Sequence, residues 1–255
     1  MNQQKRNAAI VYRLCCLFYF FVFIGCAAER NPATFKAFEA VHLNKKITEA
    51  GDKKIDNFLV IMDASSTMNN RYLYEAFDSS TIPTLFEVEK ELLKRLNQTI
   101  PAIKLNAGIR TFGFGPCQSW RFSLELLKLG NYEKKSFNDA LDTLECAGGG
   151  SPMDFAIDQA GVDLESAPGN TAIIIISDGD MGDDAAVAVF ELKKQYGERI
   201  CVHTISIGQN PANRLAMRRL SALSRCGYTT TAEEIATGAG MAEFVEKAFF
   251  KKRQK

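Results

Sequence analysis

The alternation of apolar and polar stretches along the chain predicts the strands of one sheet. Residues 58–62 form a continuous apolar run, and residues 171–177 hold a second one. Such runs are typical of parallel strands that are buried on both faces of a sheet. Further strands are predicted at residues 107–114, 120–127, 200–207 and 227–231. The short connection 115–119 predicts a hairpin between two of them, and hence an antiparallel edge strand.

Between these strands, apolar residues recur at helical spacing. This periodicity predicts helices at residues 84–96, 136–144, 153–162, 185–196, 213–223 and 241–250. Strands that alternate with helices predict a three-layer α/β/α sandwich of the Rossmann type. We expect its sheet to be doubly wound, six-stranded and mostly parallel, with one antiparallel edge strand.

The first 25 residues have the pattern of a secretion signal. Basic residues precede an apolar run at 14–24, which is eleven residues long. A membrane-spanning helix needs roughly 20 apolar residues, so this run is too short to be one. Residues 23–26, Phe-Ile-Gly-Cys, resemble a bacterial lipobox, in which the cysteine is acylated. This resemblance implies a lipid anchor at Cys26 that attaches the protein to a membrane.

The residue after Cys26 is Ala27 rather than aspartate, which favours the outer membrane, facing the periplasm. The alternative is ordinary cleavage near Ala28, which would release a secreted or periplasmic soluble protein. We therefore divide the chain into a signal peptide (1–25), a tether with a helical segment (26–55), one globular domain (56–250) and a basic tail (251–255). In the tether, Phe35, Phe38 and Val41 recur at three-residue steps, as in an amphipathic helix that packs on the domain; the alternative is a spacer from the membrane.

Composition narrows the classes of partner. The 255-residue chain is 24% charged, and basic and acidic residues nearly balance outside the signal. This balance argues against nucleic acid as a partner.

Three stretches of the chain carry oxygen-bearing side chains at the ends of predicted strands or loops. The strand at 58–62 ends on Asp63, which Ser65 and Thr67 follow at two-residue steps. Ligands bind outside the carboxyl ends of strands in open α/β sheets. A carboxylate with two hydroxyls suits a small divalent cation such as Mg²⁺. For this stretch alone, the alternative is a turn in which these side chains cap the next helix.

Two later stretches favour the cation. The strand at 171–177 ends on Asp178, and a glycine loop at 148–150 precedes Ser151. All three stretches together resemble the von Willebrand factor A domain family with its metal-ion-dependent adhesion site. The family's Asp-x-Ser-x-Ser pattern matches residues 63–67, with Thr67 in place of the last serine. Its loop threonine falls on Ser151 and its second aspartate on Asp178. The two departures from the family pattern are Thr67 and Ser151, and both residues keep a hydroxyl.

The resemblance covers residues from about 56 to 249, and it implies what the site binds. The expected metal ligands are Asp63, Ser65, Thr67, Ser151 and Asp178, and the expected ion is Mg²⁺ or Mn²⁺. In this mode an acidic side chain of a partner completes the coordination of the ion. We therefore expect a membrane-anchored adhesion module that docks another envelope protein and is not an enzyme.

Two alternatives remain open. One is a non-catalytic scaffold with a vestigial metal site, and the other is a metal-assisted hydrolase. The hydrolase is disfavoured because Ser65 stands where haloacid-dehalogenase-type phosphatases need a second carboxylate. A Gly-x-Ser-x-Gly elbow and a Walker loop are also absent from the sequence.

The cysteines fit an oxidising compartment. Outside the signal and Cys26, the chain has an even number of them: Cys117, Cys146, Cys201 and Cys226. Three pairings are possible, and we favour Cys117 with Cys146 and Cys201 with Cys226. Free buried thiols are the alternative. A zinc site is disfavoured because His203 has no neighbouring ligand pair, and we expect this histidine to pack in the core.

Aromatic residues are interpreted mainly as packing residues. Trp120 is expected in the core or at the sheet edge. Tyr72, Tyr74 and Phe77 follow the first site loop, where they either line a recognition surface or pack over the start of the next helix.

Overall fold

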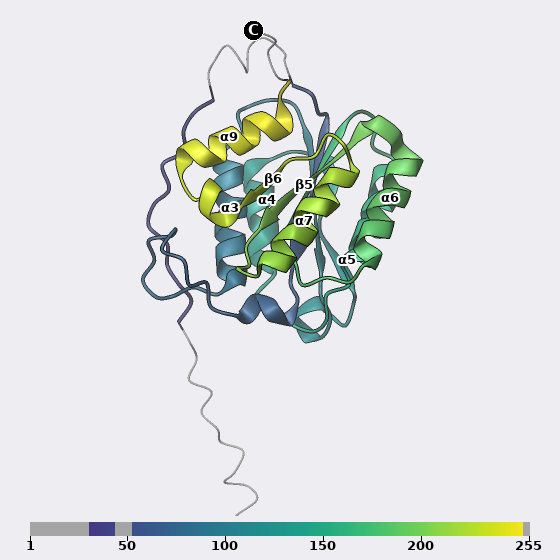
Figure 1. Ribbon diagram of the computed structural model, residues 1–255. Helices are drawn as coiled ribbons and strands as arrows, with labels where there is room; N and C mark the ends of the chain where they lie inside the picture. The colour runs from purple at the N-terminus through teal and green to yellow at the C-terminus, as the bar shows by residue number, and fades with distance from the viewer. Residues whose placement is uncertain (1–30, 44–52, 252–255) are drawn as a thin grey trace, which may run out of the picture. The chain divides into compact units, whose positions relative to one another are not determined.

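The computed structural model describes residues 31–43 and 53–251, and the compact unit discussed below begins at Ala33 (Figure 1). The expected signal peptide, the lipidation site at Cys26 and most of the basic tail lie outside the described residues. The strands form one six-stranded sheet in the order β3-β2-β1-β4-β5-β6. They are β1 (Asn57–Asp63), β2 (Asn106–Phe112), β3 (Ser123–Asn131), β4 (Thr171–Ser177), β5 (Ile200–Ser206) and β6 (Thr229–Thr231).

The expected sheet is confirmed. β1 lies at its centre and pairs in parallel with β2 and β4, while β3 runs antiparallel to β2 at one edge. β3 begins three residues later than predicted. Ser119 and Trp120 adopt left-handed backbone conformations, which a strand cannot contain, so the connection from β2 extends to residue 122.

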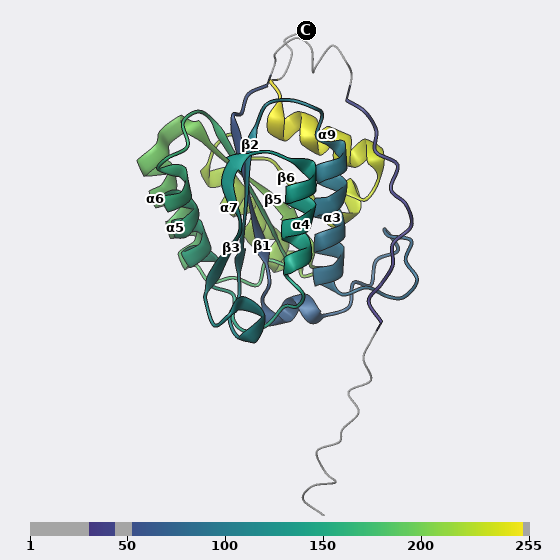
Figure 2. The ribbon, with the colours of Figure 1, turned by 180° about the vertical axis from the view of Figure 1, so that it is seen from behind.

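Seven helices of the described chain cover the two faces of the sheet (Figures 1 and 2). Their bounds are α3 (Leu85–Thr99), α4 (Lys134–Thr143), α5 (Met153–Leu164), α6 (Asp184–Tyr196), α7 (Pro211–Leu223), α8 (Ala232–Ile235) and α9 (Gly238–Phe249). Helices α3, α4, α8 and α9 pack on one face, and α5, α6 and α7 on the other. Short 3-10 turns η1 (Ser66–Asn69), η2 (Pro116–Gln118) and η3 (Gly197–Arg199) lie in the connections.

The central strand supplies side chains to both cores. Phe58, Val60 and Met62 of β1 contribute to the α3 side, whereas Leu59 and Ile61 contribute to the α5 side. Alternate residues of a strand point to opposite faces. The uninterrupted apolar run of β1 therefore follows from helices that cover both faces of the sheet.

Helix α3 begins where the sequence provides a capping box. The Thr84 hydroxyl accepts a hydrogen bond from the Glu87 backbone N–H at 3.2 Å. In return, the Glu87 carboxylate accepts one from the Thr84 backbone N–H at 2.6 Å. These two bonds satisfy backbone donors that a helix start otherwise leaves unpaired.

The helix expected in the tether is not formed in residues 31–43, where the chain has no helical turn. Phe35 instead forms an isolated antiparallel bridge with Ser79. The Arg95 guanidinium lies 5.0 Å from the centroid of the Phe38 ring. An extended chain brings these rings onto α3 and the loop before it, and these tertiary contacts outweigh the helical periodicity.

The described part of the chain contains two disulfides, Cys117–Cys146 and Cys201–Cys226. They are the two pairings that we favoured from the sequence. The first joins the β2–β3 connection to the segment after α4, and the second joins β5 to the chain that enters β6. Among the described residues, no helix has the length and apolar character needed to cross a membrane.

His203 of β5 is fully buried, as expected for a core residue. Its Nδ1 accepts a hydrogen bond from the Tyr228 backbone N–H at 3.1 Å. Burial, with a smaller contribution from the positive charge of Lys54, lowers the pKa of His203 from 6.5 to about 3. The folded state therefore holds a neutral imidazole at pH values where the unfolded chain binds a proton.

This difference predicts an acid-sensitive stability. The contribution of His203 to the free energy of unfolding is fully present above pH 6.5. It is lost as the pH falls from 6.5 towards 3, by about 1.4 kcal/mol per pH unit. Urea unfolding of the wild type and of His203→Gln from pH 4 to 7 tests this. The stability advantage of the wild type over the variant should shrink on acidification. Two parallel pH profiles would contradict the prediction.

Candidate functional site

The candidate site lies at the carboxyl end of β1, where Asp63 is the last residue of the strand and is fully buried. One carboxylate oxygen accepts a hydrogen bond from the Ser65 backbone N–H at 2.8 Å. The other accepts one from the Ser177 hydroxyl at 2.6 Å. Since Ser177 ends β4, these bonds orient the Asp63 carboxylate between two neighbouring strand ends.

The turn after β1 places two hydroxyls together. Ser65 precedes the 3-10 turn η1, and its Oγ lies 3.0 Å from the Oγ1 of Thr67. Ser65 is buried, while Ser66 between them is exposed. The side chains of Asp63, Ser65 and Thr67 thus form one cluster of a carboxylate and two hydroxyls.

The glycine loop joins this cluster through its backbone. The Gly149 carbonyl accepts a hydrogen bond from the Ser66 N–H at 2.9 Å, and the Gly148 N–H donates to the Ala64 carbonyl at 2.7 Å. Gly149 has a φ of 74°, and a Cβ there would collide with the Phe114 carbonyl oxygen. Only glycine allows this approach. The loop then carries Ser151, two residues beyond the contact.

Asp178 follows Ser177 at the end of β4 and is almost fully buried. It lines a polar cavity of about 390 Å³ together with Thr67. The other lining residues come from the chain after η1, the start of α3, the β4–α6 connection, the β5–α7 connection and α7: Asn70, Arg71, Leu85, Asp180, Gly208, Gln209, Asn210 and Asn213. The cavity gives a group from outside access to the site.

The structure thus brings together residues from all three predicted stretches. Asp63, Ser65 and Thr67 are linked by side-chain and backbone hydrogen bonds. Asp178 is close enough for its charge to raise the pKa of Asp63. Ser151 is joined to them through the backbone of its loop, as described above.

Electrostatics at the site favour a nearby positive charge. Burial raises the pKa of Asp63 to about 7, against the opposing effect of its hydrogen bonds from Ser177 and Ser65. Burial, followed by the charge of Asp63, raises the pKa of Glu89 well above its usual value. Burying carboxylates without a compensating charge is unfavourable, and a cation at the site would relieve this cost.

Glu89 was not predicted as part of the site. This residue of α3 is fully buried, and one carboxylate oxygen accepts a hydrogen bond from the Asp63 backbone N–H at 2.8 Å. The sequence carried a signal for it, because Glu89 falls on the apolar stripe of α3 between Leu85 and Leu92. A carboxylate on such a stripe needs a buried polar partner.

The donor set fits a small divalent cation. Ser151 has a buried hydroxyl without a hydrogen-bond partner among the described residues. A buried hydroxyl normally has a partner, and a cation would supply one. Within the described part of the chain, no three His, Cys, Asp or Glu side chains form a metal-binding group. Two carboxylates with three hydroxyls suit Mg²⁺ or Mn²⁺ better than zinc, and their low charge argues against calcium.

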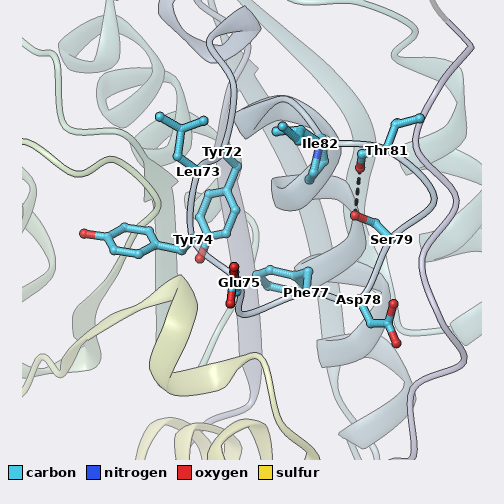
Figure 3. A pocket seen from close by; sticks show the side chains of 10 residues that line it. Tyr72, Leu73, Tyr74, Glu75, Phe77, Asp78, Ser79, Thr81 and Ile82 are labelled. Atoms are coloured by element: carbon cyan, nitrogen blue, oxygen red, sulfur yellow. Dashed lines mark hydrogen bonds between the residues drawn. The ribbon is translucent and has the colours of Figure 1, made fainter.

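Two of the three aromatic residues after η1 pack in the core, which is one of the two roles considered from the sequence. Tyr72 and Phe77 are buried in the core on the α3 side, with ring centroids 5.5 Å apart. Tyr74 is 38% exposed, and the Arg214 guanidinium lies 5.5 Å from its ring centroid. Figure 3 shows these rings at a separate cavity, in which Ser79 donates a hydrogen bond to the Thr81 carbonyl. The site cavity does not include these rings.

No family model matches the sequence, and no curated protein matches it either. Solved structures do match the fold. An aerotolerance-related membrane protein from Bacteroides fragilis, solved with multiple mutations to serine, is 16% identical with a TM-score of 0.54. That match covers 75% of this chain and 98% of the other.

Two further structures carry the name of a domain family. A von Willebrand factor type A structure from Catenulispora acidiphila is 14% identical, with a TM-score of 0.55, over 88% of this chain and 52% of that one. The von Willebrand factor domain of the type V pili tip protein Mfa5 from Porphyromonas gingivalis is 9% identical, with a TM-score of 0.52. That match covers 78% of this chain and 97% of the other. The chain therefore has a von Willebrand factor A-like fold.

Proposed function

We propose that this protein is a non-enzymatic binding module that docks an acidic side chain of a partner protein through a divalent cation. Asp63, Ser65, Thr67, Ser151 and Asp178 would hold the ion, which is Mg²⁺ or Mn²⁺. The bound ion supplies an electrophilic position that a carboxylate from outside can fill. The buried, unpartnered hydroxyl of Ser151 is the observation that carries the proposal.

Groups around the cavity support an acidic ligand. The amides of Asn70 and Asn210 and the guanidinium of Arg71 belong to residues that line it. Amide N–H and guanidinium groups donate hydrogen bonds to carboxylates, and those from arginine are charge-assisted. Residues of the chain itself can therefore orient an incoming acidic side chain.

A catalytic role has less support. His203 is fully buried, and its Nδ1 is occupied by the Tyr228 backbone N–H, so this side chain cannot exchange protons with a substrate at the site. General acid–base catalysis needs a titrating group within hydrogen-bond reach of the substrate. Docking requires only the ion and the cavity.

We place the protein in a bacterial envelope. Structures with this fold include a protein named as membrane-associated and a pilus-tip domain, which supports an envelope location. Acylation at Cys26 would attach the protein to the outer membrane, facing the periplasm. Its partner is then another envelope protein.

A matched pair of substitutions in one turn tests the cation. Ser65→Ala removes a buried hydroxyl of the site, whereas Ser66→Ala removes an exposed one next to it. Calorimetric titration of purified protein with Mg²⁺ should show affinity reduced about 10-fold or more for Ser65→Ala. Ser66→Ala should bind like the wild type. Equal affinities for the two variants would reject this set of ligands.

Docking is tested with the same variants. Wild type and Ser66→Ala should capture the same protein from an envelope extract in Mg²⁺, and should lose it in EDTA. Ser65→Ala should capture less of that protein at limiting Mg²⁺. Capture that persists in EDTA would instead support a scaffold with a vestigial metal site.

A further inference from the structure

Four aromatic side chains, three exposed and one half-buried, form a patch at the same edge of the sheet as the candidate site. We call this patch the aromatic platform, and it consists of Phe114, Trp120, Phe122 and Phe155. Trp120 is 66% exposed, Phe122 50% and Phe155 40%. The ring centroid of Phe114 lies 5.8 Å from that of Trp120 and 5.0 Å from that of Phe122. The ring of Phe122 also lies 5.9 Å from that of Phe155.

The platform is connected directly to the loops of the candidate site. The Phe114 N–H donates a hydrogen bond to the Gly148 carbonyl at 3.0 Å, in the loop that carries Ser151. Phe155 lies in the first turn of α5, four residues after Ser151. Figure 2 shows the connection from β2 to β3 beside the short helical turn η1, at the lower edge of the sheet. One partner segment can therefore contact both surfaces.

We expected Trp120 to pack in the core or at the sheet edge, and this prediction is wrong because its side chain is largely exposed. The backbone holds this side chain in solvent. Ser119 and Trp120 have φ values of 49° and 60°, in the left-handed region that residues with a Cβ rarely adopt. Such strain persists only where the surroundings impose it, and it concentrates at functional sites.

Several contacts impose this conformation. The Trp120 N–H donates a hydrogen bond to the Gly115 carbonyl at 2.8 Å, and the Cys117–Cys146 disulfide ties the connection to the segment before the glycine loop. Gln118 is fully buried, and its side-chain oxygen accepts a hydrogen bond from the Thr111 hydroxyl at 2.7 Å. The platform is therefore preorganised, which lowers the entropic cost of binding.

We propose that the aromatic platform is a second contact surface for the partner, and that it binds a protein segment with an apolar side chain a few residues from an acidic one. This inference rests on the proposed function, because the acidic residue is the one that reaches the cation. Charge complementarity supports this occupant, since Arg121 is exposed between Trp120 and Phe122 and the cation proposed for the candidate site would attract an acidic side chain. Exposed tryptophans are frequent centres of binding energy in protein interfaces.

The test begins with a selection from a library of random 12-residue peptides on the purified wild-type protein in Mg²⁺. Selected peptides should combine an acidic residue with a nearby aliphatic, aromatic or proline residue. Their affinities are then measured for Trp120→Ala, Trp120→Phe and Phe190→Ala. Phe190 is the matched control, because it is 59% exposed on α6, away from the platform.

Trp120→Ala should weaken peptide binding about 10-fold or more without changing the affinity for Mg²⁺. Trp120→Phe should keep most of the affinity, and Phe190→Ala should keep all of it. Equal effects of Trp120→Ala and Phe190→Ala, or a library that yields no peptide, would overturn the inference. Binding of a glycan array that depends on Trp120, in place of peptides, would also overturn it.

Failure of the inference can be distinguished from failure of the proposed function. Peptide binding that needs Mg²⁺ but not Trp120 would support docking through the cation and reject the aromatic platform as a contact surface. Peptide binding that needs Trp120 but persists in EDTA rejects docking through a cation, and with it the occupant proposed here.

Discussion

Replacing Asp63 by asparagine is expected to abolish stabilisation of the protein by Mg²⁺ without unfolding the cation-free form. The carboxylate is the buried negative charge of the first loop, and an amide of the same shape cannot balance an ion. A ligand at 100 times its dissociation constant stabilises a folded protein by about 2.7 kcal/mol. This gain should be present in the wild type and absent in the variant.

The cation-free variant should retain much of its stability because asparagine keeps the shape and part of the hydrogen bonding. Its amide oxygen can still accept from the Ser65 N–H. Its amide N–H can donate to the Ser177 oxygen, which already accepts a hydrogen bond from the Gly179 N–H at 2.9 Å. Burial also disfavours the charged form of Asp63, as its pKa of about 7 indicates. The Ser177 hydroxyl loses its acceptor in the variant, so we expect a loss of about 1–3 kcal/mol in EDTA.

Denaturant unfolding in EDTA and in saturating Mg²⁺ measures both quantities. The control is Asp180→Asn, which changes an exposed carboxylate that lines the same cavity but is not one of the expected metal ligands. This control should keep most of the Mg²⁺ effect. A variant at position 63 that Mg²⁺ still stabilises by 2 kcal/mol or more would show that the ion binds elsewhere.

Replacing Phe58 by alanine is expected to destabilise the protein by about 3–5 kcal/mol. Phe58 of β1 is fully buried at the centre of the α3-side core. The centroid of its ring lies 5.2 Å from that of Tyr132, 5.8 Å from Phe137 and 5.3 Å from Phe249. Three different elements would border the cavity, so they cannot close it by one local movement.

Phe190→Ala is the control for this substitution, because it removes the same atoms from a largely exposed position on α6. Its effect should stay within about 0.5 kcal/mol. Urea unfolding at neutral pH compares the two variants. A loss below 2 kcal/mol for Phe58→Ala would show that the core collapses around the deleted ring.

Much of the fold was predictable because its signals are local. The apolar runs of β1 and β4 reflect burial on both faces, and the capping box at Thr84 marks the start of α3 within one residue. The order of strands and helices then leaves few possible topologies, and the observed sheet is the expected one. By contrast, the four-residue helix α8 was missed, because one turn carries too little periodicity to be recognised.

The candidate site was predictable as a set of residues. Asp63 and Asp178 end neighbouring parallel strands, so their proximity follows from the topology alone. Whether an ion binds there stays a prediction. Glu89 escaped notice because its place on the apolar stripe of α3 indicates burial, but not that its carboxylate reaches the backbone of β1.

Short stretches of the chain determine three features: the order of elements, the burial of the central strands on both faces, and the oxygen-bearing side chains at the strand ends. Periodicity and turn chemistry act over a few residues, so these features need no knowledge of distant contacts. The extended course of residues 33–43, the buried bond from Asp63 to Glu89 and the outward position of Trp120 could not be foreseen in this way. Each depends on residues far apart in the chain, whose contacts override local preference once the protein has folded.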